Sequence, residues 1–241
     1  MKVKNRLLDT GTIIYQNDEW FKFSLDSVLL AKFVTLNLRA KNVMDFATGN
    51  APIPILLTFR TKAFVYGVEY QRCVYELGVE SILENQLDKQ IKLIHADVKN
   101  LNQKFVSDSF DVVTCNPPYF KINNPDYFND NSVKSLARHE ITLTLDDVLK
   151  QASYLLKNGG IFAMVHRTER FIEIIEKMKK YHIEPKRVQF VYSKKGRNSD
   201  LFLIEGIKNG RTGLKLLSPL IVHNDDDSYT EEVLEILNFS K

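Results

Sequence analysis

The stretch Phe110-Asp-Val-Val-Thr-Cys-Asn-Pro-Pro-Tyr119 decides how this 241-residue chain is interpreted, because a strand-like apolar run ends abruptly in two prolines. Each proline lacks a backbone donor and restricts φ, so the strand must stop and the next residues must form a stiff turn. At that turn stand the amide of Asn116, the carbonyl of Pro117 and the ring of Tyr119. Such a set can hold a planar amino group by hydrogen bonds and stacking.

A strand–loop–helix pattern precedes this stretch, over residues 42–57. The apolar run that opens it contains Asp45, and Gly49 lies in the loop, where a backbone can turn sharply and let a ligand approach closely. Pro52 suits the first turn of the following helix. A dinucleotide-binding loop is the alternative interpretation, but Asn50-Ala51-Pro52 offers few backbone donors where a pyrophosphate would lie.

Two further predicted strands lead to acidic residues. Residues 63–69 end in Glu69, where a carboxylate can accept both hydroxyls of a ribose, and residues 91–95 run into Asp97. Asp45, Glu69, Asp97 and Asn116 therefore follow four successive strands. Because ligands of open α/β sheets bind across the carboxyl ends of the strands, this order predicts one site at one edge of a sheet.

The Asn116-Pro-Pro-Tyr119 turn resembles the [Asn/Asp]-Pro-Pro-[Tyr/Phe] hallmark of amino-methyltransferases that use S-adenosylmethionine, and residues 45–51 resemble the Asp-x-Gly-x-Gly-x-Gly motif of class I methyltransferases. Alanine stands at two of the glycine positions, Ala47 and Ala51, so we expect a left-handed backbone only at Gly49. The resemblance implies a cofactor site and a target-amine site. The cofactor site would comprise Asp45, Ala47, Gly49, Glu69, Asp97 and Asn116, and the target amine would be held by Asn116, Pro117 and Tyr119.

Residues 1–25 are interpreted as an entry arm. Two β-like runs, 12–15 and 20–23, flank the turn-prone Gln16-Asn17-Asp18, which predicts a hairpin. Asp26 is expected to cap the helix that follows. The phrase from Phe23 to Ala31 also resembles a segment that lines the methionine end of the cofactor in RNA amino-methyltransferases, which adds Asp26 to the candidate cofactor ligands.

The second half of the chain carries candidate contacts to RNA. Residues 120–137 are polar and turn-rich, and we expect a lid over the target base. Arg138 and His139 could meet a phosphate and the base, with a helix-entry cluster as an equal alternative. Predicted strands 186–192 and 201–206 form a hairpin, and we favour phosphate contact over a purely solubilising role for its basic loop. The basic residues of that loop are Lys194, Lys195 and Arg197.

Composition favours a single domain over residues 1–241, with an arm and helix at 1–38 and a Rossmann-like core at 39–241. The chain is 44% hydrophobic and has only two cysteines, far apart, which indicates a reducing compartment and no metal site. No run approaches ~20 apolar residues, so we expect a cytoplasmic protein without membrane contact. No obligate protein partner is evident.

Charge is unevenly distributed along the chain. Six acids and one lysine occupy residues 223–241, which leaves 32 bases against 24 acids in residues 1–222. A moderately basic body with an acidic tail is compatible with a nucleic-acid substrate.

These features predict an α/β, Rossmann-like class I methyltransferase fold. We expect a mostly parallel seven-stranded sheet with an antiparallel final hairpin, helices on both faces, and a short N-terminal hairpin. Over nearly its full length the chain resembles bacterial tRNA (adenine-N6) methyltransferases that act on the anticodon loop of valine tRNA, which implies S-adenosylmethionine as cofactor and tRNA as partner. The Asn-Pro-Pro-Tyr motif leaves N2-guanine rRNA and release-factor glutamine-amide methyltransferases as alternatives. The alternative that is not an enzyme is an RNA-binding module without catalytic activity.

Overall fold

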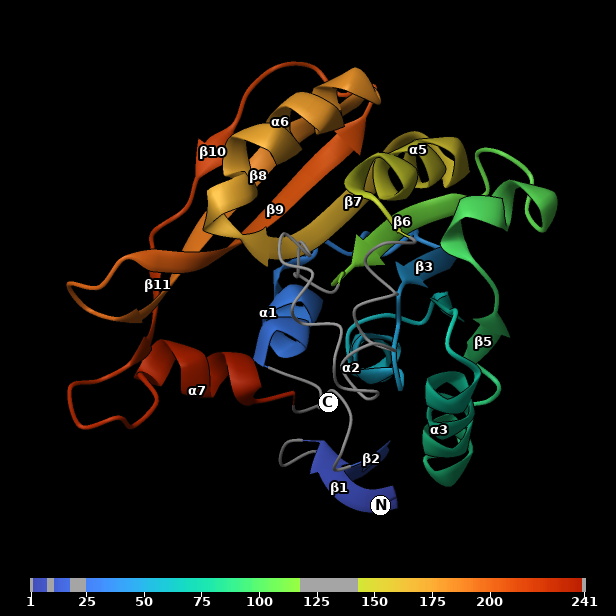
Figure 1. The fold of residues 1–241 in the computed structure, drawn as a ribbon, viewed down its shortest axis with the longest axis horizontal. Coiled ribbons are helices and arrows are strands. Elements are labelled where there is room, and N and C mark those ends of the chain that lie inside the picture. The colour runs from blue at the N-terminus through green and yellow to red at the C-terminus, as the bar shows by residue number, and fades with distance from the viewer. Residues whose placement is uncertain (1, 8–10, 18–24, 118–142, 240–241) are drawn as a thin grey trace, which may run out of the picture.

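The computed structural model describes residues 2–7, 11–17, 25–117 and 143–239. Its central feature is a twisted sheet with strand order β10-β8-β9-β7-β6-β3-β4-β5, in which β11 also pairs with β8 (Figure 1). The strands are β3 Asn42–Phe46, β4 Phe64–Glu69, β5 Ile91–His95, β6 Phe110–Cys115, β7 Leu156–Arg167, β8 Ile183–Lys194, β9 Ser199–Lys208, β10 Lys215–Leu216 and β11 Leu220–His223. The seven predicted strands are present, and two short edge strands, β10 and β11, extend them.

Strand direction determines where a site can form. Among the described strands of this central sheet, β9 alone runs against its neighbours, pairing antiparallel with both β7 and β8. The remaining pairs are parallel, including those of β11 and β10 with β8. The carboxyl ends of β3, β4, β5, β6, β7, β8 and β11 therefore meet at one edge, which we call the carboxyl edge. The hairpin loop between β8 and β9 lies at this same edge.

Helices cover both faces of the sheet, as predicted. The helices of one face are α1 Leu25–Phe33, α2 Pro52–Thr58, α3 Arg72–Glu84 and α7 Glu231–Leu237; those of the other are η2 Val98–Gln103, α5 Leu145–Leu155 and α6 Phe171–Lys180. Successive strand residues alternate between the two cores: Val43 packs in the first and Met44 in the second. None of the helices in the described ranges is long and apolar enough to cross a membrane.

The N-terminal hairpin exists, but its strands differ from the prediction. β1 Lys2–Leu7 pairs antiparallel with β2 Thr12–Asn17, so Gln16 and Asn17 lie in a strand and not in a turn. The predicted second strand, 20–23, lies outside the described residues. Tertiary contacts explain the difference, since β2 is held extended by α3: Ile13 N donates to Asn85 Oδ1 at 2.9 Å and Tyr15 N to Ser81 Oγ at 2.9 Å.

The first helix begins two residues earlier than the cap at Asp26 predicted. It starts at Leu25, which puts Asp26 in the first turn and not at the cap position. A carboxylate there still interacts favourably with the positive end of the helix dipole. Most of the residues of this helix are buried: Ser27, Val28, Leu29, Leu30, Ala31 and Phe33.

The carboxyl end of α1 is fixed by two arginines and a glutamate. Arg60 donates to Val34 O at 3.0 Å, and Arg187 donates to Phe33 O at 2.6 Å. Glu205, only 4% exposed, accepts from Thr35 N at 2.7 Å and also pairs with Arg187. Cations at a helix C-terminus satisfy carbonyls that have no partner within the helix. This network holds α1, and with it Ser27, against the sheet.

Candidate functional site

Four polar residues that follow successive strands lie together at the carboxyl edge. Asp45 belongs to β3 and Glu69 ends β4, while Asp97 lies two residues after β5 and Asn116 directly follows β6. The sheet order places these strands side by side as β5-β4-β3-β6. The structure therefore brings to one edge of the sheet four residues that are far apart along the chain.

Asp45 is a buried support. Its side chain is 0% exposed, and its two carboxylate oxygens accept hydrogen bonds from the hydroxyls of Thr48 and Thr114, each at 2.6 Å. Burial raises the pKa of Asp45 to about 7, the nearby Glu69 adds to the rise, and the two hydroxyl donors oppose it. The carboxylate thus links the loop after β3 to strand β6, and its contacts are to protein groups.

The raised pKa of Asp45 predicts a pH effect on stability. The folded chain keeps this proton to about pH 7, whereas an unfolded aspartate loses it near pH 4, so between these values the folded state binds more protons. The contribution of Asp45 to the free energy of unfolding should therefore fall as the pH rises from about 4 to 7. Thermal melts from pH 5 to 8 should show a shallower pH dependence for Asp45→Asn than for the wild type. Parallel curves for the two proteins would contradict this assignment.

The loop after β3 adopts the left-handed conformation three times, not once. Ala47, Gly49 and Ala51 have φ of 50°, 60° and 73°. The prediction of a single left-handed position was wrong, because hydrogen bonds outweigh a steric cost of about 1–2 kcal/mol for each alanine. Thr48 N donates to Val68 O at 2.9 Å, and Ala51 N to Thr48 O at 3.1 Å. Strained backbone of this kind is typical of ligand-binding loops.

Glu69 connects two loops of the site. Its side chain accepts from Gly49 N at 2.9 Å through Oε2 and from Gln71 N at 2.8 Å through Oε1. The residue is only 4% exposed. A Cβ added at Gly49 would meet nothing within 4 Å, so there is open space beside the loop that Glu69 holds. Glu69 and Gly49 together therefore offer carboxylate acceptors next to a backbone that a ligand can approach.

Asp97 and Asn116 flank these residues. Asp97 caps η2 by accepting from Lys99 N at 2.9 Å, and its side chain stays partly exposed. Asn116 Nδ2 donates to the hydroxyl of Ser27 at 3.0 Å, and Ser27 is buried on α1. This bond fixes the orientation of the amide, with Nδ2 toward α1 and Oδ1 on its other side. Pro117 follows immediately.

Two titratable side chains near the edge lack a strong acid–base role. Cys115 ends β6 completely buried, and burial raises the pKa of its thiol well above 9.0, so it is a packing residue and not a nucleophile. His166, near the end of β7, is 2% exposed, and burial lowers its pKa to about 4. Its Nδ1 accepts from Arg167 N at 2.8 Å, so the ring is a neutral, weak base.

Sequence reasoning missed three hydroxyl residues of the site: Ser27, Thr48 and Thr114. Each donates to or accepts from one of the predicted polar residues. A threonine in a strand or loop has no distinguishing pattern, so only its neighbours in space reveal its role. The predicted lid 120–137, and with it Tyr119, Arg138 and His139, lies outside the described residues.

The basic hairpin loop reaches the carboxyl edge, but its three cations differ. Lys195 and Arg197 are exposed in the turn between β8 and β9. Lys194 instead pairs with Asp227 at 2.8 Å and donates to the carbonyl of Asp225 at 3.0 Å. Lys194 therefore ties the hairpin to the acidic turn that precedes α7.

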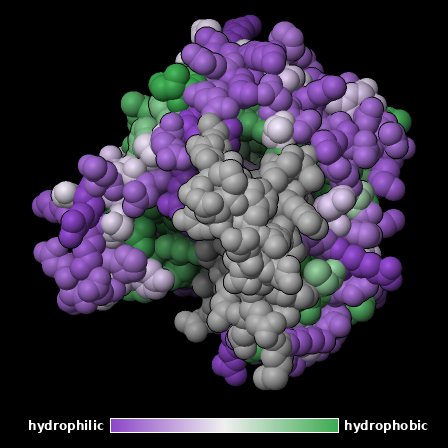
Figure 2. Space-filling model, viewed as in Figure 1, coloured by the Kyte–Doolittle hydropathy of each residue, from purple (hydrophilic) through white to green (hydrophobic). Residues whose placement is uncertain are grey.

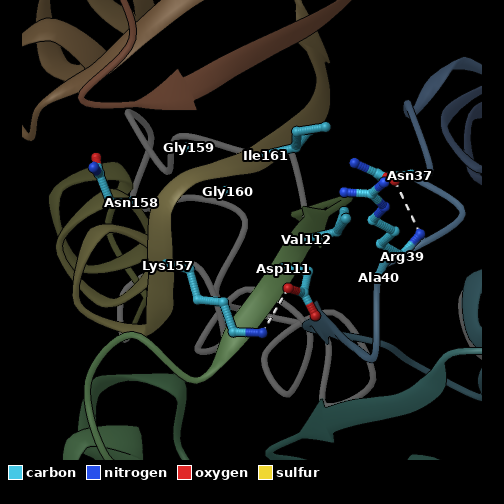
Figure 3. A pocket seen from close by; sticks show the side chains of 10 residues that line it. All are labelled: Asn37, Arg39, Ala40, Asp111, Val112, Lys157, Asn158, Gly159, Gly160 and Ile161. Atoms are coloured by element: carbon cyan, nitrogen blue, oxygen red, sulfur yellow. Dashed lines mark hydrogen bonds and ion pairs between the residues drawn. The ribbon is translucent and has the colours of Figure 1, made fainter.

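A cavity of about 160 Å³ lies at the opposite edge of the sheet, by the starts of β6 and β7 (Figure 3). Lys157 crosses it to Asp111 at 2.6 Å, and Asp111 also accepts from the backbone of Lys41 and Asn42. These bonds lower the pKa of Asp111. The polar groups that line the cavity therefore connect the starts of β3, β6 and β7, far from the carboxyl edge.

Comparison with known proteins gives a consistent family. The family model described as "Methyltransferase domain" matches residues 38–232. A Bacteroides fragilis protein named tRNA1(Val) (adenine(37)-N6)-methyltransferase is 27% identical over 86% of this chain and 87% of its own length. Proteins of the same name from Proteus mirabilis and Shewanella woodyi are 28% and 22% identical; they are matched over 88% and 89% of this chain and 83% and 89% of their own lengths.

Solved structures agree on the fold. A predicted O-methyltransferase from Agrobacterium tumefaciens superposes with a TM-score of 0.72 at 21% identity, over 89% of this chain and 96% of that one. Geranyl diphosphate C-methyltransferase from Streptomyces coelicolor, in complex with S-adenosyl-L-homocysteine, gives a TM-score of 0.57 at 12% identity, over 76% and 78% of the two chains. The predicted class I methyltransferase fold is confirmed.

Proposed function

This chain belongs to the Methyltransferase domain family, and we propose that it transfers a methyl group from S-adenosylmethionine to the N6 amine of an adenine in the anticodon loop of a valine tRNA. Relatives bearing that activity in their names match it over most of their length. The observation that carries the proposal is Asn116, which follows β6 at the carboxyl edge with its amide oriented by Ser27. An amide and a proline carbonyl at this place suit an exocyclic amine.

The residues present fit the cofactor. The carboxylate of Glu69 lies beside the open space at Gly49, which suits a ribose, and the partly exposed Asp97 would accept an adenine amino group. Ala47 lies in the same loop, and Asp26 lies on α1 near Ser27, where we place the methionine end. Asp45 would act through the loop that it supports. When bound, S-adenosylmethionine supplies an electrophilic methyl group on a sulfonium.

The chain's own residues would act mainly by positioning. An exocyclic adenine amine is a poor nucleophile, because its lone pair is delocalised into the ring. Asn116 Oδ1 and the Pro117 carbonyl can each accept one N–H, which favours a pyramidal nitrogen whose lone pair faces the methyl group. Tyr119 would stack on the extruded base. No strong base is required, since the methylated amine sheds its proton readily.

Mass spectrometry of nuclease-digested tRNA tests the proposal directly. Purified protein incubated with S-adenosylmethionine and unmodified valine tRNA should produce N6-methyladenosine. N2-methylguanosine in rRNA, or methylglutamine in a release factor, would instead identify one of the alternative amines. Absence of S-adenosylmethionine binding by calorimetry would favour an RNA-binding module.

The proposed RNA surface predicts a change in salt dependence. Lys195 and Arg197 are exposed at the carboxyl edge, and removing one cation that binds a phosphate should reduce the slope of log K against log salt by about one unit. Replacing both by alanine should therefore flatten the slope for tRNA by about two units without changing S-adenosylmethionine affinity. Lys194→Ala, which removes a lysine already paired with Asp227, should change the slope less.

If the variant with alanine at Lys195 and Arg197 shows the same salt dependence of tRNA binding as the wild type, this loop is not part of the RNA surface.

We retain Arg138 and His139 as further proposed RNA contacts. We also propose that the protein acts in the cytoplasm, where its tRNA substrate would be found. We propose that residues 1–241 form a single domain.

A further inference from the structure

A pair of stacked aromatic rings lies beside the basic hairpin loop. His223 ends β11 and Tyr229 precedes α7, and their ring centroids are 5.1 Å apart with an interplanar angle of 19°. The two residues also form an antiparallel bridge. Tyr229 is 40% exposed although one face of its ring is covered by His223. The pair therefore presents an aromatic surface to solvent.

This aromatic pair is held rigidly. His223 pairs with Lys194 in the β11–β8 register, and its Nδ1 lies 3.3 Å from Ser193 O. On the other side of the turn, Asn224 Nδ2 donates to Tyr229 O at 3.2 Å, and the hydroxyl of Thr230 donates to Ile221 O at 2.7 Å. A ligand stacked on a surface that is already ordered loses little binding energy to ordering it.

Acids outnumber cations around the pair, because Glu231 and Glu232 of α7 add to the acids of the loops. The cations of the hairpin loop are Lys194, Lys195 and Arg197, and the acids of the adjacent turn are Asp225, Asp226 and Asp227, with Asp200 at the start of β9. Lys194 pairs with Asp227, and Asp226 accepts from the hydroxyl of Ser228 at 2.6 Å. Figure 2 shows the lobe formed by these loops, at the left of the view, as largely hydrophilic. Lys194 is neutralised by Asp227 and the adjacent acids repel phosphate, so the ring pair itself suits an uncharged planar group, while the exposed Lys195 and Arg197 remain the proposed phosphate contacts.

We propose that Tyr229, backed by His223, is a stacking platform for an unpaired base of the RNA substrate. The inference rests on the proposed function and adds a second base contact to it. Strands β7, β9 and β8 separate β6 from β11, so the strand spacing alone puts the platform at least roughly 19 Å from Asn116. The base bound there is therefore another nucleotide than the one methylated. Base–aromatic stacking is a sequence-tolerant way to hold a single-stranded loop.

Fluorescence anisotropy with labelled valine tRNA, over a salt series, tests the platform in the full chain. Tyr229→Leu keeps an apolar contact with His223 but removes the aromatic face, and it should raise the Kd for tRNA about 5- to 100-fold. Tyr229→Phe should bind like the wild type. Because stacking releases no counterions, the salt slope should stay unchanged in both variants. Tyr154→Leu is a matched control, since Tyr154 is 37% exposed on α5, away from the carboxyl edge.

Three outcomes of the anisotropy measurements would contradict the proposed stacking platform at Tyr229. Wild-type affinity in Tyr229→Leu, equal losses in the Leu and Phe variants, or a reduced salt slope would overturn the platform. Ultraviolet crosslinking of the wild-type protein to tRNA containing 4-thiouridine needs no variant: an adduct on Tyr229 supports the proposal, and adducts only elsewhere overturn it. Methylation of tRNA by the wild type together with an unaffected Tyr229→Leu variant would reject the platform alone. A wild type that neither binds nor methylates tRNA would reject the proposed function as well.

Discussion

Replacing Asn116 by alanine should lower the rate of methyl transfer by about 10²- to 10³-fold while S-adenosylmethionine affinity stays within a few-fold of wild type. The reason is that the proposed contact of Asn116 is to the reacting amine, where it matters most in the transition state. Single-turnover methylation and calorimetric titration measure the two quantities separately. The amide donates to the hydroxyl of Ser27, so Ser27→Ala should give a smaller loss of rate by loosening its orientation.

A matched control exists at the other end of the sheet. Asn42 begins β3, and its side-chain amide donates to Ser109 O at 3.2 Å, so Asn42→Ala removes a comparable amide without touching the carboxyl edge. This variant should methylate tRNA as the wild type does. If Asn116→Ala loses cofactor affinity and turnover equally, then Asn116 acts in cofactor binding and its assignment to the amine is incorrect.

Glu69→Gln should behave in the opposite way, raising the Kd for S-adenosylmethionine about 10- to 100-fold with a much smaller effect on the rate at saturating cofactor. A glutamine keeps one oxygen acceptor and replaces the other by a donor. It can no longer accept from both Gly49 N and Gln71 N while also receiving ribose hydroxyls. Hydrogen bonds to charged groups contribute about 1.5–3 kcal/mol each, which sets the expected size.

Glu205→Gln provides the control for burial. Glu205 and Glu69 are each 4% exposed and each accept backbone hydrogen bonds, but Glu205 serves the carboxyl end of α1. Glu205→Gln should lower the melting temperature without a matching change in cofactor affinity of the folded protein. An unchanged Kd in Glu69→Gln would mean that another residue receives the ribose.

Much of the fold follows from local sequence. The short apolar runs at 42–46, 63–69, 91–95 and 110–114 lie in strands β3 to β6, because runs of this length bounded by polar turns have few other ways to be buried. Their polar end residues converge because parallel strands joined by helical crossovers must point the same way. Thus the sequence was sufficient to predict the carboxyl edge and its four residues.

The exceptions share one cause, which is contact between segments distant in sequence. The extended strand β2 passes through turn-prone Asn17 because α3 supplies hydrogen-bond partners to Ile13 and Tyr15. Ala47 adopts a left-handed backbone in the loop where Thr48 N donates to Val68 O of β4, a bond that outweighs the steric cost. Neither partner is visible in a local pattern.

By itself the sequence determined which strand each polar residue belongs to or follows, and the chemistry available at each position. Only the tertiary structure decided how those residues are used: Asp45 is enclosed by two threonine hydroxyls, and Lys194 is paired with Asp227. Residue type sets which hydrogen bonds and charges a side chain can offer. Burial and partners, which depend on the whole packed chain, set which of those remain available to a ligand.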